Sequence, residues 1–148
     1  METITINTGL KKFLLIDTID FVGPDQIKGR KQFLHMPVYT AIESLAQLGA
    51  LHVRYMNHFK KHAFLLKINQ VTCNSTQLKD GEYHLNGSLE SSSSNAFLYT
   101  LRAENKQDGI IGRFTFAVSD YSTEFNQDIL EDHYSQVFQC LTRDLKID

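Results

Sequence analysis

The longest helical pattern in the chain runs over Val38–Phe59, where apolar or small residues recur around nearly the whole circumference. Such a distribution is typical of a helix that is buried on all sides. Pro37 precedes the segment, and proline suits a first helical turn because its missing N–H would be unpaired there in any case. The pattern therefore predicts a long buried helix, which turns polar and solvent-exposed towards Arg54 and His58.

Alternating apolar and polar residues predict strands on both sides of this helix. One strand, Lys12–Val22, precedes the helix and ends at Gly23-Pro24, while the polar and basic segment Asp25–Gln32 is expected to be a loop. Turn-like segments separate the four strands that are predicted after the helix, as in consecutive antiparallel strands. These four strands are Ala63–Val71, Glu82–Glu90, Ala96–Glu104 and Ile110–Val118.

The last segment, Ser122–Leu145, has apolar residues at helical spacing and Ser122 or Thr123 as a capping residue. It is expected to form an amphipathic helix that lies on the sheet or on a partner. The whole order predicts an α+β fold in which one antiparallel sheet curls around the long central helix.

Composition fits a single domain over residues 1–148, with a core at about 12–118 and the closing helix at about 122–145. The net charge of −2 gives no global field that would attract nucleic acid or an anionic membrane. No signal peptide or membrane span is evident. Two cysteines without CxxC spacing argue against a zinc site or a disulfide framework, and they fit a cytoplasmic protein.

Glu43 is the candidate catalytic residue, because it stands in the middle of the apolar helical segment. Removing an unpaired carboxylate from water costs several kcal/mol, so such a group is usually paired or employed. An apolar environment also tends to raise the pKa of a carboxyl group, which makes it a usable acid or base. We expect a buried Glu43 that faces a cavity. The structural alternative is a carboxylate bonded to Gln47, which lies one turn later on the same face.

Gln47 is predicted to orient Glu43 or a water molecule, or simply to be its hydrogen-bond partner. His35, just before the helix, is either an acid/base residue or a loop residue that caps the connection. Gln47, Pro37 and Val38 are expected to line the substrate site. Only His58 and His62 share a metal-ligand spacing, and they lack a matching carboxylate, so no metal and no cofactor is predicted. One group of cations could dock an acidic carrier protein or form an ordinary solvated surface, namely Lys28, Arg30, Lys31, Arg54, Lys60 and Lys61.

The segment MPVYTAIESLAQLGAL resembles the central-helix motif of bacterial 3-hydroxyacyl-ACP dehydratases, which have the hotdog fold. In that family a proline begins the helix, an acidic residue follows six residues later, and Ala-Gln comes soon after. Pro37, Glu43, Ala46 and Gln47 match this register. The run Phe13–Asp17 also resembles the opening strand of the family, which usually ends in Asp.

The chain departs from the family at the catalytic histidine. The family places this residue fourteen positions before the acidic residue, which falls on Gly29 here, and Val38 replaces a family glycine. His35 either substitutes for the missing group, or the two-residue dehydratase machinery is absent. Hydrolysis of a thioester needs less, because one carboxylate can activate water.

The resemblance implies an enzyme that handles acyl thioesters carried on ACP or CoA. Its leading activity is that of a dehydratase-like lyase of fatty acid or polyketide metabolism. The alternatives are a thioesterase that uses Glu43 alone and a non-catalytic acyl-binding subunit. The resemblance also implies a homodimer with a continuous sheet and the active site at its interface.

Overall fold

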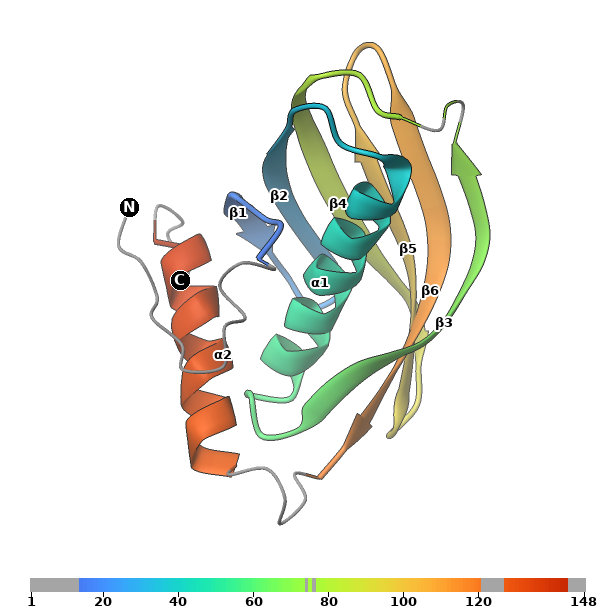
Figure 1. Cartoon of the computed structure of the whole chain (residues 1–148). Coiled ribbons are helices and arrows are strands. Elements are labelled where there is room, and N and C mark those ends of the chain that lie inside the picture. The colour runs from blue at the N-terminus through green and yellow to red at the C-terminus, as the bar shows by residue number, and fades with distance from the viewer. Residues whose placement is uncertain (1–13, 74, 76, 121–126, 144–148) are drawn as a thin grey trace.

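The computed structural model describes residues 14–73, 75, 77–120 and 127–143. Its centre is a six-stranded antiparallel sheet that curves around one long helix (Figure 1). The strands lie in the order β1-β2-β4-β5-β6-β3, and all neighbouring pairs are antiparallel. The elements are β1 (Thr18–Val22), β2 (Gln26–Phe33), α1 (Val38–Met56), β3 (His62–Cys73), β4 (Gly81–Ser92), β5 (Ala96–Glu104), β6 (Gly109–Ser119) and α2 (Gln127–Leu141).

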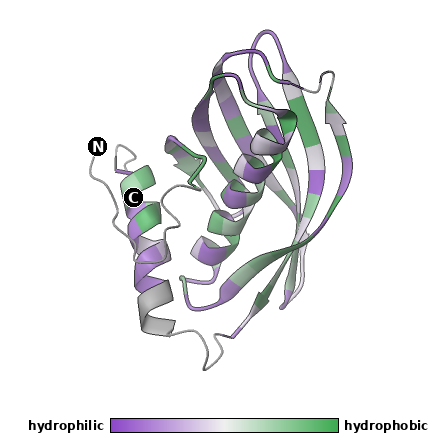
Figure 2. Ribbon diagram, viewed as in Figure 1, coloured by the Kyte–Doolittle hydropathy of each residue, from purple (hydrophilic) through white to green (hydrophobic). Residues whose placement is uncertain are grey.

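The core lies between α1 and the concave face of the sheet. Along β4, β5 and β6 every second side chain points inward, which gives the bands of alternating hydropathy in Figure 2. Tyr83, Tyr99 and Phe116 are fully buried on this face. Gly49 lets α1 approach the sheet closely, because a Cβ atom there would lie 2.5 Å from the Phe116 ring. The four strands predicted after the helix are confirmed as β3, β4, β5 and β6.

The helix α1 ends three residues earlier than predicted. His58 and Phe59 have positive φ angles of 55° and 61°, a left-handed backbone that cannot continue an α-helix. The N–H of Phe59 donates to the carbonyl of Arg54, and the N–H of His58 donates to that of Tyr55. These two bonds form the Schellman pattern that satisfies the last carbonyl groups of a helix.

The prediction of a loop at Asp25–Gln32 is wrong, because β2 occupies most of this segment. In β2 the buried positions include Ile27, Gly29 and Phe33. Gly29 interrupts the apolar pattern of the inward face, and a Cβ atom there would lie 2.6 Å from the carbonyl oxygen of Thr18 in β1. From residue 14 onward, the structure therefore has two strands before α1, where the sequence predicts one.

Within the described residues, the edge strand β3 pairs only with β6. Its register shifts twice, between Leu65 and Lys67 and between Asn69 and Thr72, and Gln70 has a positive φ of 55°. Extra residues of this kind bend a strand, which fits the strong curve of β3 in Figure 1. Most of β3 is exposed, so this end of the sheet is open in the single chain.

The helix α2 packs beside the C-terminal half of α1 and near β1 (Figure 1). The ring of Phe138 stacks on Tyr55 with centroids 5.2 Å apart, and the guanidinium of Arg54 lies 3.7 Å from the centroid of the Tyr134 ring. The prediction of an exposed Arg54 is wrong, since α2 buries it to 7% exposure. The predicted caps at Ser122 and Thr123, and the predicted end of this helix at Leu145, lie outside the described residues.

Candidate active site on the open half of the central helix

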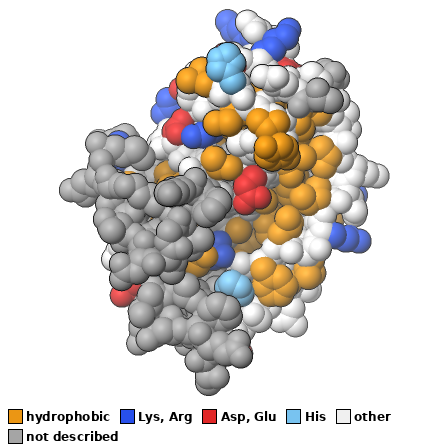
Figure 3. Space-filling model, in the orientation of Figure 1, with side chains coloured by type: hydrophobic (Ala, Val, Ile, Leu, Met, Phe, Trp, Pro, Cys, Tyr) orange, Lys and Arg blue, Asp and Glu red, His pale blue; other side chains and the backbone are white. Residues whose placement is uncertain are grey.

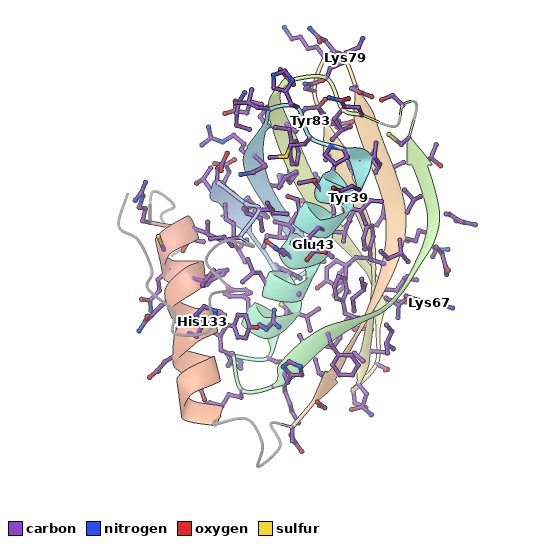
Figure 4. The ribbon with its side chains drawn as sticks, in the orientation of Figure 1. Tyr39, Glu43, Lys67, Lys79, Tyr83 and His133 are labelled. Atoms are coloured by element: carbon purple, nitrogen blue, oxygen red, sulfur yellow. The ribbon has the colours of Figure 1, made fainter. Side chains whose placement is uncertain are left out.

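Glu43 lies on the side of α1 that the sheet does not cover. Its side chain is exposed, so the prediction that Glu43 is buried is wrong. Figure 4 labels Glu43 and Tyr39 on this side of α1. Figure 3, in the same orientation, shows an acidic side chain at the border of a run of hydrophobic side chains between α1 and β3.

We call this surface the open face, defined by Tyr39 and Glu43 of α1 with Leu65, Ile68 and Val71 of β3. Leu65 pairs with Phe116 and Ile68 with Phe114, so both lie on the helix-facing side of the sheet. Val71 lies on that side as well, because its Cγ2 would be 3.1 Å from a Cβ atom at Gly112. Tyr39 is 73% exposed, and both Leu65 and Val71 are 38% exposed. The open face is thus a largely apolar surface that carries one carboxylate.

Gln47 does not pair with Glu43. Its Oε1 accepts a hydrogen bond of 2.8 Å from the backbone N–H of Leu15, and the hydroxyl of Ser44 donates to the carbonyl oxygen of the same residue. Two α1 side chains therefore bind the backbone of Leu15 much as a neighbouring strand would. This fixes the segment before β1 against the helix. The role of Gln47 in orienting Glu43 stays a prediction.

His35 is held by Asp80. The backbone N–H of His35 donates to Asp80 Oδ1 at 2.8 Å, and its Nε2 lies 3.6 Å from Asp80 Oδ2. His35 has a positive φ of 53°, which is uncommon for this residue type, and its side chain is 85% exposed. Among the described residues it makes no hydrogen bond or ion pair with Glu43.

Pro37 and Val38 are both half-buried at the start of α1. Pro37 forms an isolated antiparallel bridge with Gln77, and the N–H of Leu78 donates to the carbonyl of Met36 at 3.2 Å. The connection between β3 and β4 therefore anchors the N-terminal end of α1, beside the open face. Because these contacts join segments far apart in the sequence, no local pattern could have revealed them.

A buried polar network, which the sequence analysis did not predict, lies further along α1. His52 is fully buried, and its Nε2 is 2.7 Å from the carbonyl oxygen of Gly23. A carbonyl only accepts, so Nε2 carries the proton and Nδ1 accepts from the hydroxyl of Tyr99. Burial lowers the pKa of His52 and raises that of Tyr99. Both ring nitrogens have partners, and burial disfavours the charged form, so His52 is a structural residue of the core.

A second cluster joins α1, β3 and α2 around Arg54. The guanidinium donates to the carbonyl of Ala63 at 2.9 Å. Burial, and then the charge of Arg54, lowers the pKa values of His62 and His133. Within the described part of the chain, no group of three or more His, Cys, Asp or Glu residues could hold a metal ion.

Most of the cations that were considered for carrier docking are engaged within the chain. Arg30 binds Asp20 through Nε at 2.9 Å, and Lys31 binds Asp17 at 3.2 Å. Arg54 is buried, Lys60 pairs with Glu131, and Lys61 pairs with Asp120. Lys28 lies over the ring of Phe21. These residues therefore do not form a surface with a large excess of positive charge.

No family model and no curated protein matches the sequence. Solved structures do match the fold. A thioesterase from Haemophilus influenzae is 14% identical, with a TM-score of 0.59 over 69% of this chain and 77% of the other. The dehydratase heterocomplex ApeI:P from Xenorhabdus doucetiae is 15% identical, with a TM-score of 0.63 over 76% and 86%. A hypothetical thioesterase from Streptococcus pneumoniae, solved with coenzyme A, is 10% identical, with a TM-score of 0.59 over 71% and 87%.

The chain therefore has the hotdog fold, as its resemblance to the dehydratases implies. Its long central helix carries the acidic residue of the motif on an open, largely apolar face. No helix in the described ranges is both long and apolar enough to span a membrane.

Proposed function

We propose that this protein is an enzyme that acts on acyl thioesters, with Glu43 as the acid/base carboxylate. The observation that carries the proposal is the position of Glu43 on the open face. Its carboxylate has no hydrogen bond or ion pair among the described residues, whereas Asp20 on β1 is paired with Arg30, and Asp17, just before β1, with Lys31. An uncommitted carboxylate beside an apolar surface can take a proton from a bound acyl group or activate water.

The proposed substrate is an acyl chain joined to CoA or to an acyl carrier protein. The apolar side chains of the open face would bind the acyl chain, and Pro37 and Val38 would lie near the thioester at the start of α1. Apolar surfaces with a few polar groups are the usual lining of small-molecule sites. The engagement of Arg30, Lys31 and Lys61 within the chain leaves no strong preference for an acidic carrier.

Two reactions fit one carboxylate on this face. Dehydration of a 3-hydroxyacyl thioester needs a base for the α-proton and an acid for the departing hydroxyl, so it requires a second group such as His35. Hydrolysis requires only that Glu43 activates a water molecule. Hydrolysis is the second candidate reaction. The contacts of His35 with Asp80 favour it, because they engage the histidine away from Glu43. An acyl-binding subunit without activity is the non-enzymatic alternative.

We propose that two copies form the functional dimer through β3. This strand ends the sheet, and Leu65, Leu66 and Val71 are 38%, 55% and 38% exposed on it. An apolar edge strand with free backbone groups is a template for pairing with another chain. Pairing of β3 with β3 of a second copy would extend the sheet and cover the open face, so that the acyl chain would enter between subunits.

The test compares the wild type with Glu43→Gln on two probes. Hydrolysis of octanoyl-CoA is followed by release of the free thiol, and hydration of crotonyl-CoA reports the reverse of dehydration. The substitution keeps the size and hydrogen bonding of the side chain but removes its acid/base function, so the rate should fall about 10²–10⁴-fold. Stability should change little, because Glu43 is exposed.

The active probe identifies the reaction class. His35→Ala then separates the two classes, since it should impair hydration but leave hydrolysis intact. A wild type that turns over neither probe, or a Glu43→Gln variant with the wild-type rate, contradicts the proposed function. Binding of octanoyl-CoA without turnover would instead support the acyl-binding alternative.

A further inference from the structure

The polar side chains of α1 that neighbour Glu43 are few, and most have another partner. Ser44 and Gln47 both bind the backbone of Leu15. Thr40 lies three residues before Glu43 and is half-buried, and its hydroxyl is attached directly to Cβ, so it cannot extend beyond the helix surface. The remaining polar neighbour is Tyr39, four residues before Glu43.

Tyr39 differs from the core residues Tyr83 and Tyr99 in its exposure and in its hydrogen bonding. It is 73% exposed, whereas Tyr83 and Tyr99 are both fully buried, and their hydroxyl groups are hydrogen-bonded. The hydroxyl of Tyr39 has no hydrogen-bond partner among the described residues. Residues four apart on a helix are neighbours, with Cβ atoms about 5–6 Å from each other. Figure 4 shows Tyr39 and Glu43 on the same side of α1.

We propose that Tyr39 is a further catalytic residue, whose hydroxyl donates a hydrogen bond to the thioester carbonyl oxygen of the substrate. The inference rests on the proposed function of Glu43. In both candidate reactions negative charge develops on this oxygen. When Glu43 takes the α-proton, the electron pair of the C–H bond moves into an enolate. When activated water attacks the carbonyl carbon, the π electron pair moves to the oxygen. A donor placed in advance stabilises either charge.

The phenol suits this role because of its length and its surroundings. Its side chain is 73% exposed, and it lies on the same side of α1 as the carboxylate of Glu43 (Figure 4). The proton of the hydroxyl stays on Tyr39 throughout, so the step requires no further acid or base. Exclusion of water by the acyl chain and by the second subunit would strengthen this hydrogen bond.

The alternative role for an exposed tyrosine is that of an apolar contact in the dimer interface, where this residue type is common. The two roles differ in which atoms matter. An interface contact depends on the ring, while the proposed donor depends on the hydroxyl. Tyr39→Phe removes only the hydroxyl and therefore separates the two roles.

The experiment measures kcat and KM of the full-length protein on the probe that the wild type turns over, octanoyl-CoA or crotonyl-CoA. Tyr39→Phe should lower kcat about 10²–10³-fold, as does removal of one donor to a developing oxyanion. KM should change less than about threefold, because the bond strengthens chiefly in the transition state. Light scattering should give the same oligomeric state as for the wild type.

Two matched variants serve as controls on the same helix. Tyr55→Phe removes the hydroxyl of a half-buried tyrosine whose ring stacks on Phe138, and it should retain the wild-type kcat. Thr40→Val removes another hydroxyl near Glu43, and this variant should also retain the wild-type kcat.

Four results would overturn the inference. Wild-type kcat in Tyr39→Phe, with Glu43→Gln inactive, would refute the role of Tyr39 and leave the proposed function intact. A loss of activity that follows dissociation of the dimer would make Tyr39 an interface residue. A loss in Thr40→Val but not in Tyr39→Phe would assign the donor to Thr40. If Glu43→Gln keeps the wild-type rate, the proposed function fails and the inference falls with it.

Discussion

The two halves of α1 have similarly apolar sequences but different surroundings. In the C-terminal half, His52 and Arg54 are buried and bonded to the backbone or to the side chains of β5 and α2. In the N-terminal half, Tyr39 and Glu43 are exposed on the open face. An apolar helix can thus have two different halves. One half completes the core of the single chain, and the other is exposed, which is where we propose that a substrate and a second copy bind.

The largest expected effect on stability comes from a substitution on the side of α1 that packs against the sheet. Leu48 is fully buried between α1 and the sheet, so Leu48→Ala should lower the free energy of unfolding by about 2–5 kcal/mol. Leu66 on β3 is 55% exposed, and Leu66→Ala should cost about 1 kcal/mol or less. Denaturant unfolding of both variants measures the contrast. Similar losses at the two positions would show that the open side is packed as tightly as the core.

A smaller loss is expected from added volume at the contact between α1 and β6. A Cβ atom at Gly49 would lie 2.5 Å from the Phe116 ring, so the ring or the helix must move in Gly49→Ala. Overpacking of this kind costs about 1–3 kcal/mol. Phe116→Leu, introduced into the same variant, should relieve part of the loss. A more stable Gly49→Ala protein would mean that helix propensity outweighs the contact.

The buried histidine predicts a loss of stability in acid. Burial lowers the pKa of His52 in the folded state below its ordinary value of 6.5. The unfolded chain therefore binds a proton more readily, and stability falls as the pH drops below about 6.5 until the folded-state pKa is passed. Above about pH 6.5 the contribution of His52 to stability is complete. The free energy of unfolding is measured at pH 7.5 and pH 5.5. It should fall less on acidification for His52→Gln than for the wild type, and equal losses would show that His52 does not cause the loss.

The sequence predicts the elements whose pattern is local. The helix α1 and strands β4, β5 and β6 lie within one or two residues of their expected bounds, apart from the end of α1, because their inward positions are regularly apolar. The strand β2 was missed because Gly29 replaces an apolar side chain where β1 approaches closely. Exposed cations such as Arg30, which pairs with Asp20, gave it the appearance of a loop.

The candidate site is less accessible to prediction from the sequence. Glu43 stands out in its apolar segment, but the sequence does not reveal which side of α1 the sheet leaves open. Gln47 was assigned to Glu43 because the two share a helix face, whereas its partner is Leu15, 32 residues away in the sequence. The role of Asp80 in holding His35 depends on a contact between residues 45 positions apart. Long-range contacts decide which side chains remain available for chemistry.

One substitution on β3 should have the smallest effect on folding but a large effect on association. Leu66→Asp places a charge on the exposed apolar edge of β3 and should change the free energy of unfolding of the single chain, apart from the contribution of dimerisation, by about 1 kcal/mol or less. If two copies pair through β3, the two charges lie at the interface and oppose association. Light scattering at micromolar concentration should then show a dimer for the wild type and a monomer for the variant. A wild type that is itself monomeric would contradict the proposed pairing.

The specific activity of this Leu66→Asp monomer is the most direct test that a second copy turns the open face into an active site. Activity is measured on the CoA thioester that the wild type turns over, together with circular dichroism to confirm that the variant is folded. The account predicts a folded monomer that has lost turnover, although Tyr39 and Glu43 are unchanged. A folded monomer with wild-type activity would contradict it, because the open face would then be complete within a single chain.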